Sequence, residues 1–140
     1  MKIAIIGSMS FAREMLNTKN KLEELGHTVV VPIGTEAHLN DREFVDNLDD
    51  NLAWCIENDI MRKNFKQVSE NDAVLVLNNK KNDLAGYIGI SALMEIGVAH
   101  FLNKKIFLME ETPHYDKVRW AHEVKIMQPV ILNGDLSKVI

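Results

Sequence analysis

The sequence predicts an α/β fold, in which helices cover both faces of one parallel sheet. Two observations lead to this prediction. Short, continuous apolar runs, which are typical of strands buried on both faces, recur along the chain. Between them lie longer segments with the apolar spacing or the end signals of helices. Strands that alternate with helices are joined by right-handed crossovers, so we expect the strands to run parallel.

The first half of the chain supplies two strands and two helical segments. Residues 2–6 (KIAII) are a continuous apolar run that ends at a glycine. Residues 11–25 have apolar side chains at helical spacing, and another glycine follows where that helix would end. Residues 28–32 (TVVVP) predict the second strand. Residues 40–68 are polar and acidic with scattered apolar side chains, and they predict one long or broken helix.

The second half supplies three strands and two helices. Residues 72–77 (DAVLVL), 105–109 (KIFLM) and 129–132 (PVIL) predict strands. Residues 91–103 predict an apolar helix between the first two of these. Residues 112–127 predict another helix, because the segment begins with Thr-Pro, which suits an N-cap followed by proline at the first helical position.

These elements predict one domain, residues 1–140, built as a three-layer sandwich. Its five-stranded parallel sheet is expected in flavodoxin-like order, within the broader Rossmann-like class. A chain of 140 residues is long enough to bury a core of its own, and it contains no internal repeat or linker.

Composition excludes several kinds of function. The net charge of −4 argues against a nucleic-acid partner, which requires a basic face. Cys55 is the only cysteine and the histidines have no metal-ligand spacing, so we predict no metal site, and no cofactor. No apolar run approaches the roughly 20 residues of a membrane span, and the chain enters its first strand without a secretory signal. We therefore expect a cytoplasmic protein with no membrane partner.

The loops that follow the first and third strands are the expected place for a ligand. In an open parallel sheet, ligands bind beyond the carboxyl ends of the strands, where the strand order reverses. Residues 7–13 (GSMSFAR) are neither a P-loop nor a G-x-G-x-x-G motif. They still offer a glycine, two hydroxyls and Arg13 near a helix N-terminus, which suits an anion. A capped strand-to-helix turn without a ligand explains the same residues.

Glu95 is the one acid of the predicted apolar helix, and no other acid lies between Asp83 and Glu110. Burying an isolated carboxylate is expensive unless it is hydrogen-bonded or used. Ser91 is a natural N-cap four residues earlier, and Gly97 costs about 1 kcal/mol inside a helix, so we expect close packing or binding there. Alternatively, Glu95 reaches the rim of the helix and binds a backbone amide. The carboxylate and the loop after the first strand are expected to open on one cleft.

The region from residue 71 to residue 109 resembles the nucleoside 2-deoxyribosyltransferase superfamily, which includes deoxynucleoside 5-monophosphate N-glycosidases. The resemblance is carried by "NDAVLVLN" and "GYIGISALMEIGVAHFLNKKIFLM". Glu95-Ile96-Gly97 with Ala99 matches the core of the helix motif of that family. The "GS" after the first strand matches the glycosidase branch, so the resemblance implies a nucleoside deoxyribosyltransferase-like fold.

The resemblance implies that Glu95 is a nucleophile that cleaves the N-glycosidic bond of a nucleoside or its 5-monophosphate. It would form a covalent glycosyl-enzyme ester, resolved by water or, in deoxyribosyl transfer, by a second base. A homodimer is also implied, with residues 40–68 or the segment around Trp120 in the interface. The residues expected to bind substrate or its phosphate are Gly7, Ser8, Met9, Arg13, Asn78, Tyr87, Gly89 and Ser91.

The sequence also departs from the family pattern. The aspartate six residues before the nucleophile is replaced by Gly89, the aspartate after the third strand by Asn78-Asn79, and the tyrosine of the first strand is absent. Asp83 is the remaining candidate to protonate the leaving base. These losses favour hydrolysis over base exchange. They are also compatible with a protein that binds or senses nucleotides without turnover. Cleavage of a nicotinamide nucleotide is a third and weaker alternative.

Overall fold

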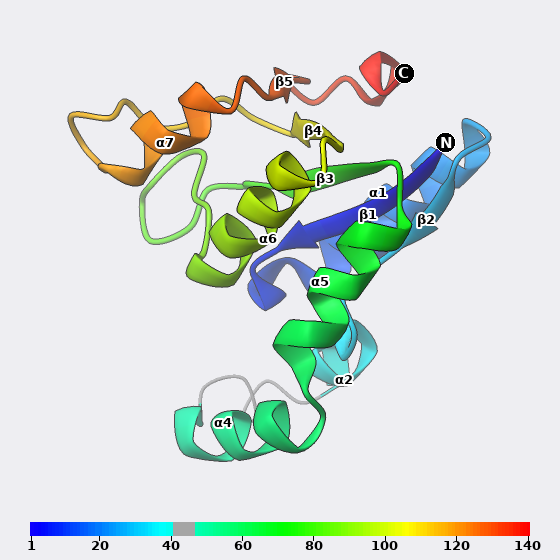
Figure 1. Ribbon diagram of the computed structural model, residues 1–140, viewed down its shortest axis with the longest axis vertical. Helices are drawn as coiled ribbons and strands as arrows, with labels where there is room; N and C mark the ends of the chain where they lie inside the picture. The colour runs from blue at the N-terminus through cyan, green and yellow to red at the C-terminus, as the bar shows by residue number, and fades with distance from the viewer. Residues whose placement is uncertain (41–46) are drawn as a thin grey trace.

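The computed structural model describes residues 1–40 and 47–140, and it contains one five-stranded sheet (Figure 1). All strand pairs are parallel, in the order β2-β1-β3-β4-β5. The predicted flavodoxin-like order is therefore confirmed. The strands are β1 (Lys2–Gly7), β2 (Thr28–Val30), β3 (Ala73–Leu77), β4 (Lys105–Leu108) and β5 (Val130–Ile131).

Helices cover both faces of this sheet, as the sequence predicts. Alternate strand residues point to opposite faces, so each face has its own apolar core. One core joins the sheet to α5, α6 and α7, and the other joins it to α1 and the C-terminal segment. The helices are η1 (Met9–Phe11), α1 (Ala12–Glu24), α2 (Thr35–Asn40), α4 (Leu48–Glu57), α5 (Ile60–Glu70), α6 (Ile90–Phe101), α7 (Trp120–Ile126) and η2 (Leu136–Lys138).

The helix predicted for residues 112–127 is wrong in its first half, because α7 begins only at Trp120. Thr112 does not cap a helix. Its backbone N–H and its hydroxyl both donate to the Glu111 carboxylate, at 3.0 and 3.3 Å. Thr112 and Pro113 are buried in a loop that packs against Gly86, where a Cβ atom would overlap the Glu111 carbonyl oxygen. This long-range packing overrides the local helix-start signal.

The predicted helical segment 40–68 is broken in the structure. Asp59 separates α4 from α5 and has φ +48°, in the left-handed region, where a helix cannot continue. Residues 41–46 of the predicted segment lie outside the described residues. Figure 1 shows α4 standing away from the sheet. None of the helices in the described ranges is both long and apolar enough to span a membrane.

Candidate functional site

Glu95 lies on the face of α6 that packs against the sheet. The buried residues of this helix are Ala92, Glu95, Ile96 and Ala99, the i, i+3, i+4, i+7 spacing of one helical face. Glu95 is 5% exposed, so it does not reach the solvent-exposed rim. The sequence places a carboxyl group where an apolar side chain would normally stabilise the core.

The Glu95 side chain faces a narrow gap between β1, α5 and α6. The gap holds about 170 Å³ of empty space, a figure that includes space open to solvent. Burial raises the pKa of Glu95 to about 7, and no hydrogen-bond donor from residues 1–40 or 47–140 offsets this effect. The other lining residues are Ala4, Ile5, Ile6, Pro32, Asn64 and Gln67, of which none is titratable.

This gap lies against β1, one of the two strands between which the strand order reverses. The chain leaves β1 for β2 on one side and returns to β3 on the other, which makes β1/β3 the switch point of the sheet. Ile6 of the gap immediately precedes Gly7. Gly7 has φ +154°, and a Cβ atom there would lie only 2.9 Å from the Leu77 carbonyl oxygen, so glycine allows β1 to end close against β3.

The loop after β1 contains a capped turn. The Ser8 side chain accepts a hydrogen bond from the Ser10 backbone N–H at 3.3 Å and caps η1. Met9 was expected to contact the ligand, but its side chain packs against the core on the α1 face, whereas Glu95 faces the other core. Arg13 is exposed in the first turn of α1, which covers the face opposite α6. Met9 therefore packs on the face opposite Glu95, and Arg13 lies on the helix that covers that face.

Lys81, which the sequence analysis did not single out, contacts two of the predicted binding residues. Its ammonium group donates to the Ser8 hydroxyl at 2.9 Å and lies 5.2 Å from the centre of the Tyr87 ring. Lys81 thus connects two predicted binding residues from different loops, and it adds a positive charge to them. In the sequence, the feature that could have indicated Lys81 is the Lys80-Lys81 pair in the loop after the third strand.

Asp83 lies at the tip of a tight turn. Lys81 and Leu84 exchange backbone hydrogen bonds of 3.1 and 2.9 Å, and Asn82 and Asp83 between them both have positive φ. Asn and Asp are favoured in such two-residue turns, so the turn explains this residue type. Asp83 is exposed, and no hydrogen bond among the described residues joins it to Glu95. The structure gives Asp83 a role in forming the turn. It adds no support for Asp83 as the acid that protonates the leaving base.

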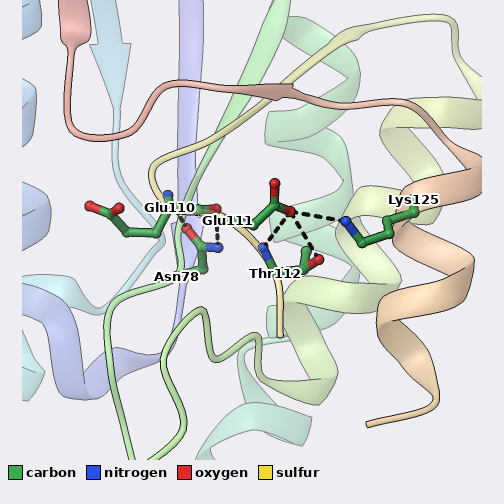
Figure 2. Close-up of polar contacts among 5 residues, drawn as sticks. All are labelled: Asn78, Glu110, Glu111, Thr112 and Lys125. Atoms are coloured by element: carbon green, nitrogen blue, oxygen red, sulfur yellow. Dashed lines mark hydrogen bonds and ion pairs between the residues drawn. The ribbon is translucent and has the colours of Figure 1, made fainter. Parts of the chain in front are cut away.

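Asn78 ties the ends of β3 and β4 together (Figure 2). Its side-chain nitrogen donates to the Glu110 carbonyl at 2.7 Å, and its oxygen accepts from the Glu110 N–H at 2.8 Å. The Asn78 side chain is completely buried, so its polar groups are used within the fold rather than presented to a ligand. Beside it in Figure 2, the Glu111 carboxylate accepts from Lys125 of α7 at 3.1 Å.

The N-terminus of α6 has no side-chain cap. The cap residue is Gly89, and Ser91, predicted as the N-cap, instead lies exposed in the first turn, with its hydroxyl 4.0 Å from the Met61 sulfur. Backbone amides of this first turn therefore have no side-chain partner. Gly97 was expected to mark a close contact, which is wrong: it is exposed, and a Cβ atom there would meet nothing within 4 Å.

Across residues 1–40 and 47–140, no group of three or more His, Cys, Asp or Glu side chains is arranged to hold a metal ion. The candidate chemical groups described above are one buried carboxyl group, Glu95, and one half-buried ammonium group, Lys81. These two features differ in environment. Glu95 lies in a gap lined by no other titratable group, whereas Lys81 is only half-buried beside Ser8 and Tyr87.

Comparison with known proteins identifies a shared fold. No protein-family model matches the chain, and no curated protein does. Among solved structures, the CMP N-glycosidase BcmB of Clostridium botulinum matches with a TM-score of 0.50. The alignment covers 95% of this chain and 90% of that one, at 17% identity. At this identity the similarity shows the fold alone, and this fold agrees with the resemblance carried by the α6 motif.

Proposed function

We propose that this protein cleaves the N-glycosidic bond of a nucleoside 5-monophosphate or nucleoside, with Glu95 as the nucleophile. The observation that carries the proposal is a buried carboxyl group, alone on an apolar helix face, at the switch point of the sheet. A costly group in this position suits a function better than it suits packing. The fold shared with a protein described as a CMP N-glycosidase supports the same reaction class.

In the proposed reaction an ionised Glu95 oxygen attacks the anomeric carbon of the sugar. The carbon–nitrogen bond breaks, its electron pair leaves with the base, and the base takes up a proton. Water then cleaves the glycosyl ester and regenerates the carboxyl group. Because the pKa of Glu95 is about 7, roughly half of the molecules carry the attacking carboxylate at neutral pH. No residue is assigned to protonate the base.

The phosphate of a monophosphate substrate is proposed to bind between Lys81, Ser8 and the uncapped N-terminus of α6. Lys81 supplies the charge, and backbone amides of the first turn of α6 supply additional donors. Tyr87, held beside Lys81, offers a ring on which a base can stack. Gly89, as the cap residue of α6, would lie against the same phosphate.

Lys81→Met is therefore expected to weaken binding of a nucleoside 5-monophosphate by about tenfold or more, because a charge-assisted hydrogen bond is lost. Affinity for the corresponding nucleoside should change little. Isothermal titration calorimetry with both ligands measures this difference. Lys80→Met, which removes an exposed charge next in sequence, is the matched control and should bind both ligands normally. Equal losses for nucleoside and monophosphate would contradict a phosphate contact.

The proposed function is tested by incubating the protein with a panel of nucleosides, their 5-monophosphates and nicotinamide mononucleotide. Free base is separated by chromatography and quantified over time. Release of base from one class of compound supports the enzyme and identifies its substrate class. Absence of release from every compound contradicts it.

The second candidate is a module that binds nucleotides without turnover. It is favoured by one observation: within the part of the chain that the structure describes, no second titratable group lines the gap around Glu95 to assist a leaving base. In the same panel, this candidate predicts binding by calorimetry with no free base.

We further propose that a second copy of the chain covers α4. Leu48, Leu52 and Ile56 repeat every fourth residue along this helix and are 77%, 60% and 70% exposed. No residue of α4 is buried, which leaves one apolar face of the helix in solvent. Trp120, the alternative interface residue, packs against the core beneath α7 instead.

Leu52→Glu is expected to convert a dimer into a monomer, because it places a charge in the centre of the proposed interface. Multi-angle light scattering at micromolar concentration measures the mass. Leu25→Glu is the matched control, since Leu25 is 53% exposed at the end of α1, and this variant should remain dimeric. A monomeric parent protein would contradict the proposal directly.

A further inference from the structure

A second hollow lies at the edge of the sheet where β4 and β5 begin. It is lined by residues from the C-terminal ends of α6 and α7, from β4 and β5, and from the C-terminal segment. Its volume is about 500 Å³, and small-molecule sites usually measure about 300–1,000 Å³. Among the described residues, none lines both this hollow and the gap around Glu95. A ligand bound there would be separate from any substrate of the proposed function.

Two left-handed turns contribute backbone to this hollow. Asn103 follows α6 with φ +55°, and Gln128 follows α7 with φ +53°. Each residue ends its helix, because a right-handed helix does not continue through the left-handed region. The N–H of Lys104 then donates to the Ala99 carbonyl at 2.9 Å, and the N–H of Gln128 donates to the Lys125 carbonyl at 3.0 Å. The turns are therefore closed by the fold itself, and the hollow exists without a ligand.

Apolar side chains form part of the lining. Ile106 and Phe107 of β4 are buried, and Met127 at the end of α7 is half-buried. Val130 and Ile140 are 48% and 78% exposed. Covering exposed apolar surface with an apolar molecule is favourable by about 25 cal/mol per Å². The hollow therefore suits a ligand with an apolar body.

Three lysines line the same hollow, and none of its described lining residues is an aspartate or a glutamate. Lys105 donates to the main-chain oxygen of Ile140 at 2.8 Å, and Lys138 donates to the Leu132 carbonyl at 3.1 Å. An ammonium group has three N–H donors, so each of these two keeps donors for a ligand. Lys104 is half-buried, and nothing in residues 1–40 or 47–140 forms an ion pair or a hydrogen bond with its side chain. In a chain of net charge −4, these lysines create a local excess of positive charge.

We propose that this hollow binds a small amphipathic anion, an organic molecule with one anionic group on an apolar body. Lys104, Lys105 and Lys138 bind the anionic group, and the body lies on the apolar lining. The alternative is that the lysines only complement the carbonyl ends of neighbouring helices and that the hollow holds water. This alternative accounts for Lys104, which follows α6, but it gives no reason for an apolar lining. The proposal does not depend on the proposed function.

The test is a titration of the isotope-labelled protein with octanoate, followed by nitrogen-15 NMR. Octanoate carries a carboxylate on an apolar chain. Saturable shifts are expected for backbone amides in the ranges 103–107 and 127–131, which include lining residues of the hollow. Inorganic phosphate and octan-1-ol each carry only one of the two parts. Each should bind at least about tenfold more weakly, because the contribution of the other part is lost.

Lys104→Glu should weaken octanoate binding by about tenfold, because it replaces an attraction with a repulsion. Lys21→Glu makes the same charge change in the last turn of α1, at another helix C-terminus, and should bind octanoate like the parent. If Lys104→Glu does not fold, Lys138→Glu makes the same test at an exposed position. The proposal is overturned by equal binding of octanoate to Lys104→Glu and the parent, or by equal binding of octanoate and octan-1-ol. Absence of saturable shifts, or shifts confined to α4 or to the region around Glu95, would overturn it as well.

Discussion

Glu95→Gln is expected to reduce the rate of base release by about a thousandfold or more, while nucleotide affinity changes by at most about tenfold. Glutamine keeps the size and hydrogen-bonding capacity of the side chain but removes the charged oxygen that attacks the sugar. An interaction needed only in the covalent step affects turnover, whereas contacts made in the bound state survive. Single-turnover release of base and calorimetric binding measure the two effects separately.

The matched control is Glu110→Gln, which removes an exposed carboxylate at the same edge of the sheet and should release base at the parental rate. Release by Glu95→Gln as fast as by the parent would exclude Glu95 as nucleophile. If both proteins bind nucleotide and neither releases base, the binding module replaces the enzyme.

Glu95→Gln is also expected to stabilise the protein at alkaline pH by about 3 kcal/mol. The pKa of Glu95 is about 7 in the folded protein, compared with 4.5 for an unperturbed glutamate. Between these values the folded protein keeps a proton that the unfolded chain has lost, so the free energy of unfolding decreases as pH rises. Each unit of pKa shift corresponds to about 1.4 kcal/mol. The penalty is absent below pH 4.5, complete above pH 7, and absent at every pH in the glutamine variant.

Urea unfolding of both proteins at pH 4, 6 and 8 measures this linkage. The difference in free energy of unfolding should be small at pH 4 and largest at pH 8. Glu57→Gln, an exposed position on α4, should follow the parent at all three values. A constant difference between the parent and Glu95→Gln would mean that the carboxyl group titrates normally and is not desolvated.

The sheet and Glu95 were predictable because their signals are local. Five apolar runs predict five strands, and one acid within an apolar helix stands out without knowledge of its neighbours. The Thr112-Pro113 start signal failed for the opposite reason. Its outcome depends on the Glu111 carboxylate and on Gly86, which is distant in the sequence. Local capping patterns do not contain that information.

Two residues near the candidate site required the tertiary structure. Lys81 is a residue type common on protein surfaces, and only folding brings it to Ser8. Asn78 shows the reverse case. Its polar side chain at the end of a strand predicts ligand binding, but the backbone of Glu110 occupies both its donor and its acceptor.

The double hydrogen bond of Asn78 also has a mechanical consequence. It joins the loop after β3 to the loop after β4, and the close packing of Gly86 on Glu111 joins them again. Glu111 is in turn bound to Lys125 of α7 (Figure 2). The loop that carries Lys81 and Tyr87 is therefore tied to the loop after β4 at two separate points, and the second of these loops contacts α7 through an exposed ion pair. We expect the two loops to keep their relative position when a ligand binds to either of them.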